Sequence, residues 1–335
     1  MKRLLAVILL AAGLWSGYWF VAKSAVQGGL TGWFDDRRAE GWQADYSDLR
    51  VVGFPNRIDT VLDDLALADP HSGWAWHAPK FQLSALSYRP NHVIAIWPDA
   101  QLLATPLGKY RLNSADMRAS ARVSGTALTL EKVLLSADKV SVNHEIDSKN
   151  AAALTLTKLN AGLERLNETA SYRVAFNADG VAPAAEFRKR IDPTGRLPQS
   201  LNALAMDMQV TFDRAWDRKS LERARPEYRR IEVKLAEATW GDLSLAAAGA
   251  VDVDAAGMVT GRITIKARNW RDILSASVNA GAIPAAMAQQ IERALGLVAQ
   301  LSGNPKTLDI PLDFKGGLML LGPVPLAQVR IDHLR

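Results

Sequence analysis

The stretch MDMQVTFD, residues 206–213, alternates apolar and polar residues at every position. Successive side chains of an extended strand point to opposite faces, so the pattern places the apolar side chains on one face and the polar ones on the other. The stretch therefore predicts a β-strand with one buried face.

The same two-residue period recurs along much of the chain. It is found at Val61–Leu67, Phe81–Ala85, Val93–Trp97, Leu128–Leu134, Tyr172–Phe176, Ile231–Leu235, Ile263–Ile265 and Leu308–Phe314. Turn residues, among them Gly53-Phe54-Pro55-Asn56 and Asp179-Gly180, separate these runs. Short spacings between such turns favour antiparallel meanders over parallel strands joined by helices.

Helical periodicity is rarer. It predicts helices over Pro183–Ile191, Arg214–Arg225 and Arg271–Leu301, the last divided near Gly281–Pro284. The fold class expected from these patterns is α+β, with a long, twisted, mainly antiparallel and groove-forming sheet and a few packed helices.

An apolar run of 19 residues, Leu4–Ala22, follows Lys2 and Arg3. As a helix it would be about 28 Å long, close to the hydrocarbon thickness of a bilayer. Aromatic residues gather toward its end, as they do at membrane–water interfaces. We expect a transmembrane anchor over residues 1–23 that includes Leu4, Leu9, Leu10, Trp15, Trp19 and Phe20.

The basic pair before this run predicts an N-terminus in the cytoplasm and the bulk of the chain in the periplasm, anchored in the inner membrane. The alternative is a signal peptide cleaved near Ala22-Lys23-Ser24, which would leave a soluble periplasmic protein. Residues 24–40 continue a helical pattern that stops at Gly41. The exported domain would cover 24–335, with a seam that divides two similar halves at about 41–180 and 200–335.

The composition excludes several classes of protein. The chain has 335 residues, no cysteine, 48% hydrophobic residues and a formal net charge of +5, so it is neither disordered nor built on disulfides or thiolate metal sites. Two of the positive charges belong to Lys2 and Arg3. The remaining charge is small and no nucleic-acid-binding motif accompanies it, so we expect no nucleic-acid partner.

Catalytic motifs are missing from the sequence. It contains no Gly-x-Ser-x-Gly, P-loop, Gly-x-Gly-x-x-Gly or His-Glu-x-x-His pattern. Ser136-Ala-Asp-Lys139 matches Ser-x-x-Lys, but it lies in an alternating region and lacks its companion motifs. The five histidines are His71, His77, His92, His144 and His333, and their spacing predicts no metal site. We expect neither an enzyme nor a cofactor.

Tryptophan is the commonest aromatic residue, with ten in the chain. Trp74 and Trp76 share one face of a predicted strand, and Trp97 follows on a later one. They either fill the core or line an apolar groove for an acyl chain or a partner. A second candidate is the turn with Arg89, Asn91 and His92, which Pro90 and Asn91 also explain as a turn of purely structural value.

Several turn motifs together resemble the uncharacterised domain-of-unknown-function family 2125. They are Gly53–Arg57, Trp74–Pro79, Tyr88–His92, Trp97-Pro98 and Ala104–Gly108, with Gly17–Phe20 and Arg37–Trp42 nearer the N-terminus. The resemblance covers nearly the whole chain. It implies an alphaproteobacterial envelope protein and no particular activity.

A fainter likeness connects the chain to AsmA-like envelope proteins, which also have an N-terminal anchor and long β-rich exported regions. It rests on the glycine-bounded strands Gly249–Asp254 and Gly261–Ala267, the helices over 271–301 and the closing segment Leu308–Gly322. AsmA-like proteins are associated with lipid transport and outer-membrane assembly, so the likeness implies a lipid ligand.

We therefore expect a membrane-anchored periplasmic protein that binds lipid or an envelope partner through a β-rich apolar surface. One alternative is a scaffold or assembly factor that binds protein and no lipid. Another is an unrecognised hydrolase, whose active site we would seek first around Arg89, Asn91 and His92.

Overall fold

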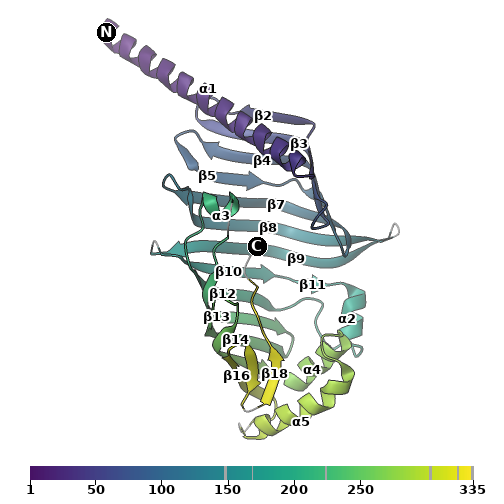
Figure 1. Ribbon diagram of the computed structural model, residues 1–335. Helices are drawn as coiled ribbons and strands as arrows, with labels where there is room; N and C mark the ends of the chain where they lie inside the picture. Colours follow the sequence, from purple (N-terminus) through teal and green to yellow (C-terminus); the bar gives the residue numbers. More distant parts are fainter. Residues whose placement is uncertain (147–148, 168, 223–224, 302–303, 323, 333–335) are drawn as a thin grey trace. The chain divides into compact units, whose positions relative to one another are not determined.

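The computed structural model describes residues 1–146, 149–167, 169–222, 225–301, 304–322 and 324–332 (Figure 1). It is mostly antiparallel β-sheet with five helices, so the predicted α+β class is confirmed. The chain forms two compact units, one of Met1–Val123 with Leu135–Ala151 and the other of Ser124–Leu134 with Ala152–Arg335.

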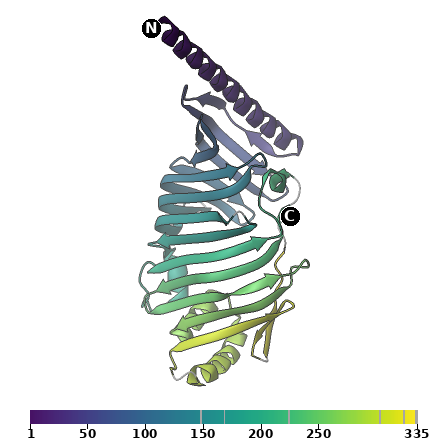
Figure 2. The same cartoon turned by 90° about the vertical axis from the view of Figure 1, so that its left-hand side faces the viewer.

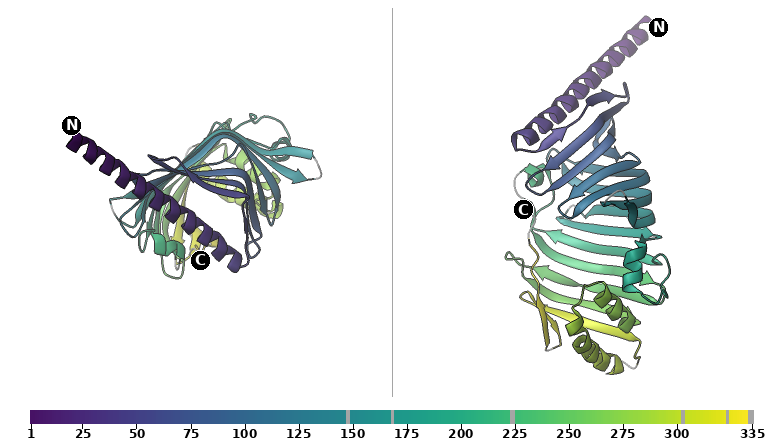
Figure 3. Two further views of the ribbon diagram at one scale, coloured as in Figure 1. Left: turned by 90° about the horizontal axis from the view of Figure 1, so that it is seen from above. Right: turned by 90° about the vertical axis from the view of Figure 1, so that its right-hand side faces the viewer.

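The first unit begins with a single long helix, α1 (Lys2–Ala39). The boundary that the sequence suggested at residue 23 falls inside this helix. The helix ends before Gly41, whose φ of 87° is a left-handed conformation that glycine adopts without strain. Figures 1 and 3 show its N-terminal part projecting past the strands of this unit.

Seven strands follow α1 in the first unit. They are β1 (Gln43–Asp45), β2 (Asp48–Val52), β3 (Arg57–Asp69), β4 (Trp74–Leu86), β5 (Arg89–Ile96), β6 (Ala100–Thr105) and β7 (Gly108–Ser124). The strand β3 pairs with β1, β2 and β4, and β4 pairs with β6 near its start and β5 near its end. Strands β8 (Thr129–Ile146) and β9 (Lys149–Leu166) contribute residues to both units.

A change of face in the β3–β4 hairpin decides which β4 side chains are buried. Asp64 has a φ of 54°, and the pairing passes from Asp63↔Lys80 to Leu65↔Ala78 across it. Because of this local twist, Leu62 and Leu65 of β3 both lie in the core of the unit, and Trp76 and Phe81 of β4 both pack against it.

That core joins α1 to the sheet. It contains Trp19 and Phe34 from the helix and Ala44, Leu49, Val51, Ile58, Leu62 and Leu65 from β1, β2 and β3. On the helix, the residues with reduced exposure recur every three or four positions from Ser16 to Arg37, as expected for one packed face. Burial of each large apolar side chain contributes roughly 1.5–3 kcal/mol, so the second part of α1 belongs to the fold of this unit.

The second unit is a further series of antiparallel strands with short helices. Its strands are β10 (Ser171–Asp179), β11 (Ala182–Pro183), β12 (Ala203–Phe212), β13 (Tyr228–Trp240), β14 (Leu243–Val253), β15 (Val259–Arg268), β16 (Thr307–Lys315), β17 (Leu318–Leu321) and β18 (Val324–Gln328). Residues 206–212 of the alternating stretch lie in β12, and Val210 and Phe212 are buried as predicted.

The helices of this unit are α2 (Ala185–Ile191), α3 (Arg218–Glu222), α4 (Trp270–Asn279) and α5 (Ala285–Leu301). Figures 2 and 3 show α4 and α5 on one face of the strands, where they cover a core that includes Trp270 and Leu308. The predicted break near Gly281–Pro284 separates α4 from α5.

The helix predicted over Arg214–Arg225 is wrong at its start, because α3 begins only at Arg218. The backbone just before α3 is hydrogen-bonded to residues of β8 and β10. The Trp216 carbonyl accepts the Leu130 N–H at 2.8 Å, and the Trp216 N–H donates to the Tyr172 hydroxyl at 2.9 Å. These tertiary hydrogen bonds replace the intrahelical ones that the sequence pattern favours.

Candidate functional site

The largest hollow described in the first unit adjoins Trp74 and has a volume of about 520 Å³. Its lining is almost entirely apolar and consists of Trp74, Leu103, Thr105, Pro106, Leu107, Tyr110, Leu112 and Val142. Small-molecule sites commonly occupy roughly 300–1,000 Å³ and have predominantly apolar linings. The hollow therefore has the size and character of a site for an apolar ligand.

Two turns and a strand pairing build this hollow. Trp76 pairs with Leu103 across β4 and β6, which brings the start of β4 beside the end of β6. The turn before β4 lies close to the β6–β7 turn, since a Cβ on Gly73 would be 3.2 Å from a ring carbon of Pro106. Trp74, at 52% exposure, thus presents its indole ring at the open side of the hollow.

The other two tryptophans of the predicted groove lie elsewhere. Trp76 is half-buried, and its indole N–H donates to the Gln101 side-chain oxygen at 2.9 Å. Its ring meets Phe81 at 5.3 Å, and Phe81 meets Trp97 at the same distance. Of the three tryptophans, the structure places Trp74 in the hollow, whereas Trp76 and Trp97 pack on Phe81.

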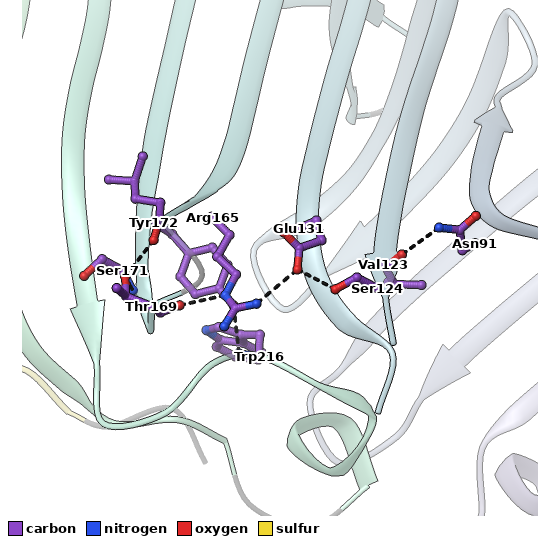
Figure 4. A network of polar contacts seen from close by, with 10 residues as sticks. Asn91, Val123, Ser124, Glu131, Arg165, Thr169, Ser171, Tyr172 and Trp216 are labelled. Atoms are coloured by element: carbon purple, nitrogen blue, oxygen red, sulfur yellow. Dashed lines mark hydrogen bonds and ion pairs between the residues drawn. The ribbon is translucent and has the colours of Figure 1, made fainter. Parts of the chain in front are cut away.

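Arg89, Asn91 and His92, which the sequence placed in a turn, lie instead at the start of strand β5, because β5 pairs with β7 there; the turn itself is residues 87–88, at the other end of the β3–β4 hairpin. Arg89 and His92 help to line a second hollow of about 230 Å³, together with Arg57, Ser84, Ala85, Leu86 and Ile94. The Asn91 amide donates to the Val123 carbonyl at 3.0 Å, which fixes the start of β5 to β7 (Figure 4). The Arg57 guanidinium pairs with Asp59 at 2.9 Å. The structure thus brings two of the three predicted residues into one hollow and gives Asn91 a positioning contact.

The predicted anchor residues divide between two environments. Leu4, Leu9 and Leu10 are exposed on the part of α1 that projects from the unit. Trp19, in contrast, is 4% exposed and lies in the core of the first unit. Among the described residues, α1 is the one helix long and apolar enough to cross a membrane.

The aromatic residues of α1 that follow its projecting part are hydrogen-bonded to the turn between β2 and β3 and to the first residue of β3. The indole N–H groups of Trp15 and Trp19 donate to the carbonyls of Pro55 and Arg57, at 3.1 and 2.7 Å. Phe20 is exposed, and its ring stacks on that of Phe54 at 5.9 Å.

A polar network in the second unit has no signal in the sequence. The Arg165 guanidinium contacts Glu131 at 3.0 Å and donates to the Thr169 carbonyl at 2.7 Å, while Glu131 accepts from the Ser124 hydroxyl at 2.6 Å (Figure 4). The partners are up to 34 residues apart in the chain, and only strand pairing brings them together. The network joins the ends of neighbouring strands and does not open into any of the hollows described above.

Next to this network lies Tyr172, which is completely buried. Burial raises the pKa of the Tyr172 hydroxyl, although the hydrogen bond from the Trp216 N–H acts in the opposite direction. The phenol therefore stays neutral at physiological pH and has a structural role as a hydrogen-bond acceptor.

The histidines that could serve as metal ligands do not come together in the part of the chain that the structure describes. His77 pairs with Asp64 at 2.8 Å, and the ring of His144 packs against Tyr110 at 4.8 Å. His333 lies outside the described residues. Within the described ranges, no three His, Asp or Glu side chains are arranged to hold a metal ion.

Ser136 and Lys139 of the Ser-x-x-Lys match both lie within β8. The motif therefore sits on an extended strand, away from a helix start.

Comparison with known sequences identifies one family. The family described as an uncharacterized protein conserved in bacteria (DUF2125) matches residues 19–330, nearly the whole chain. No curated protein matches the chain. The predicted resemblance to this family is confirmed, and the fainter likeness to AsmA-like envelope proteins stays a prediction.

Proposed function

Because the chain belongs to the DUF2125 family, whose description names no activity, we propose from the geometry that it is a non-catalytic, membrane-anchored protein that binds the acyl chain of a lipid in the hollow beside Trp74. The single observation that carries the proposal is this apolar hollow of about 520 Å³, open at an exposed indole ring. An exposed apolar surface of this kind favours occupation by an apolar ligand, since the removal of apolar surface from water lowers the free energy.

The proposed anchor is the projecting part of α1, held in the inner membrane with the N-terminus in the cytoplasm and the two units in the periplasm. Residues 1–15 are exposed on all sides of the helix, and the run from Leu4 carries no charge up to Ala22. Lys2 and Arg3 favour the cytoplasmic position of the N-terminus.

The packing of α1 supports an uncleaved anchor over a signal peptide. A cut near Ala22–Ser24 would remove Trp19 from the core and separate it from the Arg57 carbonyl to which it donates. Loss of a buried tryptophan side chain costs about 3–5 kcal/mol, so the mature chain would lose a large part of its stability.

The test is to purify the full chain from bacterial membranes in mild detergent and to measure bound lipid by native mass spectrometry. The variant Trp74→Glu removes the indole ring and introduces a carboxylate into the apolar lining, which opposes an acyl chain. The matched control is Trp33→Glu, since Trp33 is also an exposed tryptophan but lines none of the hollows described here.

We expect lipid bound to the wild-type chain and to Trp33→Glu, and a loss of roughly tenfold or more in Trp74→Glu, equivalent to about 1.4 kcal/mol of binding free energy. A wild-type chain that carries no lipid would overturn the proposal, as would equal lipid loads in the two variants. A protein crosslinked from position 107, at the rim of the hollow, without any lipid would instead favour the scaffold or assembly factor.

A further inference from the structure

The two turns at one end of the β3–β4 hairpin form a compact structure, which we call the tip and define as residues 53–57 and 86–92. The Ser87 N–H donates to the Asn56 carbonyl at 2.9 Å, and the Ser87 hydroxyl donates to the Pro55 carbonyl at 3.2 Å. Ser87 is completely buried between the two turns. The tip is therefore held together by hydrogen bonds of its own.

Three aromatic side chains of α1 fasten the helix to the tip. The indole N–H groups of Trp15 and Trp19 donate to the Pro55 and Arg57 carbonyls, and the Tyr18 hydroxyl donates to the Ser87 carbonyl at 2.7 Å. The three donors occupy little more than one helical turn. The tip thus has a fixed level along α1, at residues 15–19.

The length of the projecting helix decides where this level lies relative to a bilayer. The stretch Lys2–Leu14 is about 20 Å long at 1.5 Å per residue, whereas the hydrocarbon core is about 30 Å thick. If α1 crosses the bilayer as proposed, the next 10 Å of helix must also lie in or at the edge of the hydrocarbon. That segment is the one fastened to the tip.

The side chains of the tip match this position. Phe54 is 52% exposed and Tyr88 58% exposed, and Phe20 of α1 stacks beside Phe54. Large aromatic residues on exposed turns are unfavourable in water but are enriched where a protein meets the headgroup region.

The charges of the tip also fit an anionic membrane surface. Its two segments contain Arg57 and Arg89 and neither Asp nor Glu. Arg57 pairs with Asp59 of β3, whereas Arg89 makes no ion pair within the described part of the chain. A basic side chain near an anionic leaflet is attracted to the negative surface potential there.

We propose that the tip is a second membrane contact: Phe54 and Tyr88 enter the interface of the leaflet that α1 leaves, and Arg89 binds lipid phosphate groups there. The contact sets the depth and orientation of the first unit on the membrane. This inference rests on the proposed function, because it requires α1 to be embedded.

The absence of cysteine from the natural chain allows the position of single sites to be measured. Single-cysteine variants of the full chain, Leu9→Cys, Asn56→Cys and His71→Cys, are labelled with a nitroxide and placed in vesicles of phosphatidylethanolamine and phosphatidylglycerol. Spin relaxation by oxygen and by a water-soluble nickel complex then reports the depth of each label. His71 is the matched control, because it is exposed in the turn at the opposite end of the β3–β4 hairpin, about 40 Å away along the strands.

We expect the labels at positions 9 and 56 to be shielded from nickel and accessible to oxygen, and the label at position 71 to be as accessible to nickel as a free label. A label at position 56 that is as aqueous as the one at 71, with position 9 embedded, would overturn this inference and leave the proposed anchor intact. An aqueous label at position 9 would overturn the anchor itself and the inference with it.

Discussion

Replacement of Trp19 by alanine tests whether this residue of α1 serves only at a membrane interface or also stabilises the core of the first unit. A residue that serves only at a membrane interface contributes little to the stability of the protein. Trp19 instead is 4% exposed among the side chains of β2 and β3, and its indole N–H donates to the Arg57 carbonyl at 2.7 Å. Its removal should therefore destabilise the first unit directly.

The magnitude follows from these contacts. Buried aromatic side chains remove about 150–250 Å² from water, which at about 25 cal/mol per Å² corresponds to roughly 4–6 kcal/mol. The lost hydrogen bond adds about 1 kcal/mol, and relaxation around the cavity recovers part of the total. We expect Trp19→Ala to cost about 4 kcal/mol, and the smaller change Trp19→Phe, which keeps most of the apolar contact, about 1–2 kcal/mol.

The assay is thermal unfolding of the full chain in a mild detergent, followed by near-ultraviolet circular dichroism. For a unit of this size, 1 kcal/mol corresponds to roughly 2–5 °C in Tm, so Trp19→Ala should lower the Tm by about 10 °C. The matched control is Trp15→Ala, because Trp15 lies one turn earlier, makes a similar hydrogen bond to Pro55 and is 37% exposed. Equal Tm values for the two alanine variants would refute the assignment of Trp19 to the core.

Two further predictions concern the second unit. Tyr172→Phe leaves the Trp216 N–H without the hydroxyl that accepts it at 2.9 Å, so urea unfolding should show a loss of about 1–3 kcal/mol; an unchanged midpoint would mean that water replaces the hydroxyl. Arg173 binds the Asp207 carboxylate through two hydrogen bonds of 2.9 and 2.7 Å, which lowers the pKa of Asp207. Because the folded pKa lies below the unfolded one, the stabilisation is present above about pH 4 and is lost as the pH falls through the folded pKa, so Asp207→Asn should flatten the acid limb of a Tm–pH curve. An acid limb of unchanged steepness would assign the pH dependence to other carboxylates.

Residues whose structure depends on near neighbours were predictable. The strict alternation at 206–213 specifies a strand whatever surrounds it, and β12 buries Val210 and Phe212 accordingly. The break between α4 and α5 also follows from local chemistry, since Pro284 cannot continue a helix.

Residues whose structure depends on distant partners were not predictable. The start of the helix at 214 was wrong because the backbone of Trp216 bonds to Leu130 and Tyr172, which are remote in the chain. Periodicity reports which face of an element is apolar, but it does not report what that face meets. The polar network around Arg165 was not predictable for the same reason, since its partners are remote in the chain.

The candidate site also has one part that depends on near neighbours and another that depends on distant partners. The sequence singled out Trp74, Trp76 and Trp97 as a set, because spacing along a strand shows that side chains share a face. Only the pairing of β4 with β6 decides that Trp74 borders a hollow, and only the change of face at Asp64 brings Trp76 and Phe81 to the same side of the sheet.

By itself, the sequence determined the α+β class, the strand and turn pattern, the apolar N-terminal helix and the family, because each of these depends on local periodicity, composition or short motifs. The tertiary structure decided that Trp19 belongs to the core of the first unit, since its carbonyl partner is 38 residues away. It also decided that the helix is fastened to the tip. Contacts of this kind depend on strand register and on a hairpin twist, and neither is encoded in any single stretch of the chain.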